Sequence, residues 1–113
     1  MLGVALLSIV TAEELKGHLD GLILAVIRAE PKHGYAVIEA LRSRSGGRLD
    51  LPEGTVYPAL HRLEQKGLLA SDWSTGSGRR RRVYRLTSRG ERELGVRRER
   101  WRDFSQTIEA VFA

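Results

Sequence analysis

Four consecutive arginines, Arg79–Arg82, form the longest run of like charge in the sequence. Adjacent guanidinium groups repel one another and add little to folding, whereas each can bind a phosphate. Residues 79–102 contain 11 arginines and three glutamates, so this segment carries a local charge of +8, against +5 for the whole chain. The pattern predicts a surface for a polyanion, with nucleic acid favoured over an anionic membrane. A solvated basic loop is the simpler alternative.

Residues that could carry catalysis form no recognisable constellation. The chain contains no cysteine, which excludes disulfides, thiol nucleophiles and cysteine-bound zinc. His18, His33 and His61 lack the spacing of metal ligands, and the glycines near residues 76–78 lack the Lys-Ser/Thr ending of a phosphate loop. We therefore expect no catalytic residue, no metal and no cofactor.

The chain of 113 residues has the length of one domain, and its 42% apolar content excludes a disordered protein. Apolar periodicity predicts a first helical segment from Thr11 to before Pro31, with a break near His18 after which Asp20 caps a second helix. Two further helices are predicted over 34–44 and 55–66. Strands are predicted over 68–74 and 82–87, followed by a helix from residue 88 almost to the end. The fold class is therefore mainly α with a small two-stranded β hairpin.

The third of these helices has two distinct faces. Val56, Leu60 and Leu63 share one stripe, which we assign to the core. The opposite face contains no acid; it consists of Thr55, Pro58, His61, Arg62 and Gln65. Such side chains suit a helix in the DNA major groove, although an ordinary solvated face has the same composition. By the same projection Tyr57 lies to the side, where it can reach a phosphate.

Two further apolar segments have predicted roles. The run within residues 1–12 is too short to span a bilayer and has no basic residue before it, so we expect an additional surface-covering element in a cytoplasmic protein without a membrane partner. In the last helix Leu94, Trp101 and Ile108 recur every seven residues, with Phe104 and Val111 between them. This heptad stripe predicts a dimer interface. Tyrosines 35, 57 and 84 are expected in the core.

Several segments together resemble the PadR family of bacterial transcriptional regulators. They include Leu19–Leu24, His33–Tyr35, the specific string Gly54–Glu64 (GTVYPALHRLE), Gly67-Leu68, Trp73 and Tyr84–Thr87. The resemblance implies a homodimeric winged-helix repressor of the shorter subfamily. Its domains would be an N-terminal extension (1–12), a winged helix-turn-helix (13–87) and a dimerisation helix (88–113).

The resemblance also implies roles for the residues singled out above. The third helix would contact bases of a pseudo-palindromic operator, and Tyr57, Lys66 and Arg79–Arg82 would contact phosphates. Trp101, with Phe104 and Ile108 as walls, would offer a site at the dimer centre for an aromatic or hydrophobic small-molecule effector. Two other readings of the residues remain: a basic RNA-binding or nucleoprotein module, and an adaptor whose last helix pairs with a different chain.

Overall fold

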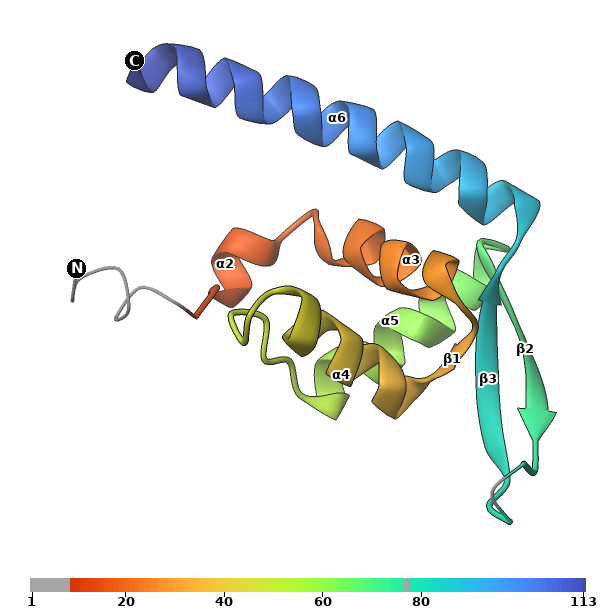
Figure 1. Cartoon of the computed structure of the whole chain (residues 1–113). Coiled ribbons are helices and arrows are strands. Elements are labelled where there is room, and N and C mark those ends of the chain that lie inside the picture. The colour runs from red at the N-terminus through yellow and green to blue at the C-terminus, as the bar shows by residue number, and fades with distance from the viewer. Residues whose placement is uncertain (1–8, 77) are drawn as a thin grey trace.

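The computed structural model describes residues 9–76 and 78–113. Within them the chain forms five helices and a small antiparallel sheet of three strands, which confirms the predicted fold class (Figure 1). The elements are α2 (Ala12–Leu15), α3 (Leu19–Ala29), β1 (Lys32–His33), α4 (Gly34–Arg44), α5 (Glu53–Gln65), β2 (Leu69–Ser74), β3 (Arg81–Leu86) and α6 (Ser88–Phe112). Most of the predicted extension over residues 1–12 lies outside the described residues.

Side chains at the helix starts explain where most of the helices begin. Thr11 and Glu14 form the predicted capping box of α2. The break at residues 16–18 is also present, but Asp20 is not a cap, because α3 begins one residue before it, at Leu19. Helix α6 begins at residue 88, as predicted. Its N-cap is Thr87, whose hydroxyl accepts a hydrogen bond from the Gly90 amide.

Helices α3, α4 and α5 enclose the hydrophobic core. Its fully buried side chains are Ile23, Leu24, Ile27, Val37, Leu41, Val56, Leu60, Leu63 and Leu69. The predicted core stripe of α5 is therefore confirmed. Of the three tyrosines, Tyr84 is buried and Tyr57 packs against the core. Tyr35 is 54% exposed, so its predicted core position is wrong: it lies in the first turn of α4, beyond the edge of the core.

The sheet has the order β1–β3–β2, so one strand more than predicted is present. Pro31 follows α3 and keeps the chain extended, and Lys32 and His33 then pair with Tyr84 and Val83 of β3. Two residues are too few to show an alternating pattern, which is why the sequence does not reveal β1. The main hairpin pairs Leu69 with Leu86 at its base and Ser74 with Arg81 near its tip.

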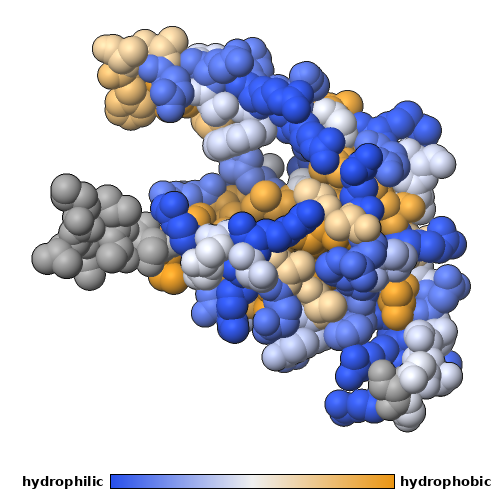
Figure 2. Space-filling model, in the orientation of Figure 1, coloured by the Kyte–Doolittle hydropathy of each residue, from blue (hydrophilic) through white to orange (hydrophobic). Residues whose placement is uncertain are grey.

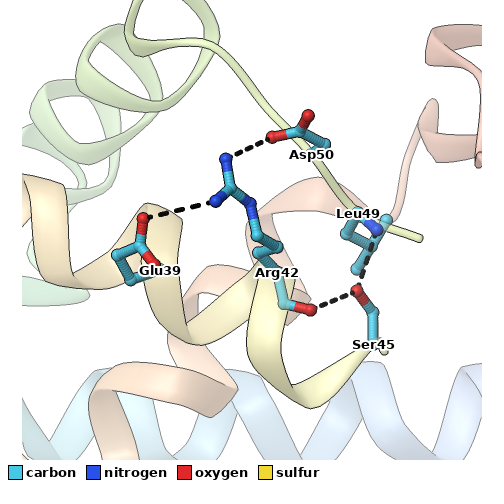
Figure 3. Close-up of polar contacts among 5 residues, drawn as sticks. All are labelled: Glu39, Arg42, Ser45, Leu49 and Asp50. Carbon is cyan, nitrogen blue, oxygen red and sulfur yellow. Dashed lines mark hydrogen bonds and ion pairs between the residues drawn. The ribbon is translucent and has the colours of Figure 1, made fainter. Parts of the chain in front are cut away.

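A polar cluster fixes the connection between α4 and α5 (Figure 3). The Arg42 guanidinium donates to Asp50 at 3.0 Å and lies 3.8 Å from a carboxylate oxygen of Glu39. The Ser45 hydroxyl donates to the Arg42 carbonyl and accepts from the Leu49 amide at 2.8 Å. These contacts lead the chain into α5, which starts at Glu53, two residues before the predicted start.

Helix α6 belongs to the domain core at one end and leaves it at the other (Figure 1). Near its start Leu94 is only 3% exposed, and Arg97 packs closely against Gly21 of α3. A methyl group at Gly21 would lie 3.2 Å from Cδ of Arg97, so the glycine permits this close crossing. Beyond this crossing the helix diverges from the other helices.

Candidate nucleic-acid interface

Helix α5 presents its predicted polar face to the surface. Thr55, Pro58, His61, Arg62 and Gln65 are all exposed, on the side of the helix away from the buried stripe. Gly67 follows the helix with a φ of +77° and turns the chain directly into β2. The outward face of α5 and the hairpin are thereby held in a fixed relation.

One residue of this face has a partner within the protein. The guanidinium of Arg62 donates to a carboxylate oxygen of Asp20 at 2.5 Å. The Asp20 side chain is only 14% exposed, whereas that of Arg62 is 47% exposed. The contact joins the edge of α5 to the first turn of α3. Arg62 therefore differs from His61 and Gln65, for which the described residues include no hydrogen-bonding partner.

A groove of about 580 Å³ separates α5 from the hairpin. Aromatic and cationic side chains predominate among its lining residues: His33, Gly34, Tyr35, Tyr57, His61, Trp73, Arg79, Arg81, Arg82 and Tyr84. Gly34 allows the ring of Tyr57 to pack directly on the start of α4, since a Cβ there would overlap the ring. Of the outward face of α5 only His61 lines this groove, beside Tyr57, so the groove joins that edge of α5 to the basic hairpin.

The four arginines of the hairpin have different surroundings. Strand alternation directs Arg82 to one face of the sheet and Arg81 to the other. Arg82 donates to the Ser71 hydroxyl at 2.7 Å, and Arg81 lies 2.9 Å from Nε2 of His33. Arg79 and Arg80 are exposed near the hairpin tip.

His33 links α4 to the hairpin through both of its ring nitrogens. Nδ1 accepts from the Ala36 amide and caps α4, while Nε2 faces the guanidinium of Arg81. Because a neutral imidazole has a single lone-pair nitrogen, the cap and the Arg81 contact compete for it. Burial and the charge of Arg81 lower the pKa of His33 and so favour the neutral ring.

Trp73 is a further residue of this surface, to which the sequence analysis gave no binding role. Its side chain is 52% exposed on β2, and the guanidinium carbons of Arg80 and Arg82 lie 4.3 and 5.1 Å from the ring centre. The strand register pairs Trp73 with Arg82. The sequence does not specify this register, so it does not predict that the ring and the arginines are neighbours.

The C-terminal half of α6 exposes an apolar surface, visible at the end of that helix in Figure 2. Trp101, Phe104, Ile108 and Val111, called the α6 stripe below, are 40–81% exposed. His18 contacts the stripe, with its ring centre 5.3 Å from that of Trp101. Leu94, predicted to belong to the same interface, is instead buried in its own domain.

Other kinds of site have no support in the part of the chain that the structure describes. It contains no group of three or more histidine, aspartate or glutamate side chains arranged to hold a metal ion. Nor does any helix in residues 9–76 and 78–113 have both the length and the apolar character that crossing a bilayer requires.

Helices α3, α4 and α5, followed by a basic antiparallel hairpin and a long terminal helix, define a winged-helix protein, whose wing is the β2–β3 hairpin. The model of the PadR-like family of transcriptional regulators matches residues 23–96. The chain belongs to this family, whose members are regulators of transcription rather than enzymes.

Individual relatives agree with this assignment. A transcriptional regulator from Mycobacterium tuberculosis is 48% identical over 62 residues, a match that covers 55% of each chain. The solved structure of a transcriptional regulator from Clostridium thermocellum has a TM-score of 0.82 at 25% identity, covering 88% of this chain and 97% of the other. A PadR family regulator from Clostridium difficile has a TM-score of 0.76 at 33% identity, with coverage of 86% and 100%.

Proposed function

We propose that this protein is a homodimeric repressor that acts in the cytoplasm and binds a two-fold symmetric DNA operator. The observation that carries the proposal is the common groove of α5 and the wing, because one duplex can contact both of its sides. Thr55, Pro58, His61, Arg62 and Gln65 would contact base edges in the major groove. Tyr57, Lys66 and the wing arginines would contact the flanking phosphates.

The α6 stripe supports the dimer. Four large apolar side chains on one exposed helix face are unfavourable in a monomer, and a second copy of the same helix offers a matching face. A two-fold dimer presents two α5 helices, which fit half-sites one helical turn, about 34 Å, apart. The DNA-binding domain would then comprise residues 13–87 and the dimerisation helix residues 88–113.

The same aromatic surface supports release by a small molecule. Trp101 and Phe104, with ring centres 6.1 Å apart, provide flat apolar walls for an aromatic or hydrophobic effector. An effector that binds better to a dimer with differently spaced α5 helices would lower operator affinity by shifting the population towards that dimer.

In vitro selection of bound duplexes from a random pool tests the DNA-binding proposal. The expected result is an inverted repeat whose half-site centres are about 10 base pairs apart. Selection without a symmetric sequence, or no duplex retained at low ionic strength, would refute it. Competition with structured RNA separates this function from a basic RNA-binding module, which would prefer the RNA.

Two sets of variants then separate affinity from sequence preference. Replacing Arg79–Arg82 with alanine should weaken binding to every duplex and reduce the salt slope by about 3 units per protomer. Arg62→Ala should mainly reduce the preference for the selected sequence. If the salt slope does not change when the four arginines are removed, the wing does not contact phosphates.

A further inference from the structure

A continuous set of side-chain contacts leads from α5 into the wing. The Ser71 hydroxyl of β2 donates to the carboxylate of Glu64 at 2.6 Å. The same hydroxyl accepts from Nε of Arg82 at 2.7 Å, and another nitrogen of Arg82 lies 3.9 Å from the Glu64 carboxylate. The side chains of Arg82 and Glu64 are 40% and 30% exposed. Arg82 is therefore engaged within the protein on the side that faces α5.

Beyond Arg82 the contacts continue to the wing tip through Trp73. The guanidinium carbon of Arg82 lies 5.1 Å from the centre of the Trp73 ring, and that of Arg80 lies 4.3 Å from it. Both distances are within the range of cation–π attraction. Arg80 itself is exposed and has no carboxylate partner within the described residues.

These surroundings give the two arginines different roles. A long side chain loses rotational freedom when it binds a phosphate, and part of this loss has already occurred if an aromatic ring holds it beforehand. Arg80 has such a ring and, among the residues that the structure describes, no carboxylate competes for it. Arg82 has the same ring, but its Nε donates to Ser71 and one of its terminal nitrogens lies 3.9 Å from the carboxylate of Glu64.

We propose that Trp73 is a positioning residue that holds Arg80 for a DNA phosphate, and that Arg82 connects the wing to α5 instead of binding phosphate. The inference rests on the proposed DNA-binding function. It narrows the phosphate contacts proposed above for Arg79–Arg82: Arg80 keeps one of them, Arg82 has none, and the orientation of the wing depends on Glu64, Ser71 and Arg82.

Salt dependence of DNA binding distinguishes the two arginines. Dissociation constants are measured by fluorescence anisotropy on a labelled duplex obtained by selection, over a series of salt concentrations. Arg80→Gln should reduce the salt slope by about 0.9 per protomer. Arg82→Gln should weaken binding and leave the slope unchanged, and Lys16→Gln, an equal loss of charge at an exposed position between α2 and α3, should change neither. Equal slope changes for the Arg80 and Arg82 variants would overturn the inference.

Substitutions of the ring test its positioning role. Trp73→Leu should weaken binding about two- to fivefold without a change in slope, because the phosphate contact remains but the ring no longer holds Arg80. Trp73→Phe retains an aromatic face and should recover most of the affinity. A leucine variant that binds as tightly as the wild type, or a phenylalanine variant no better than leucine, would show that the ring does not position Arg80.

A double-mutant cycle provides a test that does not depend on Trp73. Glu64→Gln and Arg82→Gln should have non-additive effects on the dissociation constant, because both disturb one connection. Additive effects would refute the connection. A wild-type protein that binds no duplex at low ionic strength would instead refute the proposed function, whereas wild-type binding with the contrary variant results refutes only the roles assigned to Trp73, Arg80 and Arg82.

Discussion

Phe104→Ala should weaken dimerisation without unfolding the protomer. Burying a whole phenylalanine side chain contributes about 1.5–3 kcal/mol, and 52% of Phe104 is exposed in the protomer. The partner can therefore supply about 1 kcal/mol at this position. Because a two-fold interface contains the residue twice, the loss is about 2 kcal/mol per dimer, or roughly a 30-fold increase in the dimer dissociation constant.

Sedimentation equilibrium over a range of protein concentrations measures this constant. Gln106→Ala provides the control, because Gln106 is exposed on the same helix but lies on the side away from the α6 stripe. Thermal unfolding at a high protein concentration shows whether each protomer still folds. A wild-type protein that remains monomeric, or equal dimer dissociation constants for the Phe104 and Gln106 variants, would refute the assignment of the stripe to the interface.

Three further substitutions test the packing around the site. Leu94→Ala should lower the free energy of unfolding by about 2–5 kcal/mol in urea titrations, because this side chain is 3% exposed within its own domain; a loss well below 1 kcal/mol would contradict its place in the core. Gly34→Ala should cost about 1–3 kcal/mol and weaken DNA binding, because the new methyl group would overlap the Tyr57 ring, whereas Gly54→Ala, with open space around its Cβ, should change stability by no more than about 1 kcal/mol; equal effects would refute the role of that close approach. The lowered pKa of His33 means that the unfolded chain binds a proton more readily than the folded one, so this contribution to stability is complete above about pH 6.5 and is lost as the pH falls below that value. His33→Asn retains a capping acceptor and should remove this part of the pH dependence, as urea midpoints of the two proteins at several pH values will show; identical pH profiles would contradict it.

Periodicity in the sequence was sufficient to predict the faces of α5. Its buried stripe of Val56, Leu60 and Leu63 and its exposed polar face follow from the helical repeat, since this helix lies across the core along its whole length. Tyr35 shares a helical face with the buried Ile38 and Leu41, so the repeat predicts it in the core, yet it is exposed. That face extends beyond the core at its N-terminal end, and the position of the core's edge depends on how the helices pack.

In α6 the repeat could not distinguish two kinds of burial. Leu94 and Ile108 occupy equivalent heptad positions, yet one is in the core of its own domain and the other is 40% exposed. The point at which the helix leaves the domain depends on its crossing with α3 at Gly21.

The wing presents a related problem, because the run of arginines predicts a cationic surface but the strand register determines which of them Ser71 and Trp73 contact.

In the bond between Arg62 and Asp20, a carboxylate of the protein itself competes for a side chain of the face proposed to contact DNA. A guanine that attracts this guanidinium must outcompete a carboxylate, and the exchange leaves a largely covered negative charge without its counterion. Selectivity at such a base pair therefore depends on the difference in free energy between the Arg62–guanine contact and the Arg62–Asp20 bond. A duplex with an unsuitable base at that position leaves the internal bond intact.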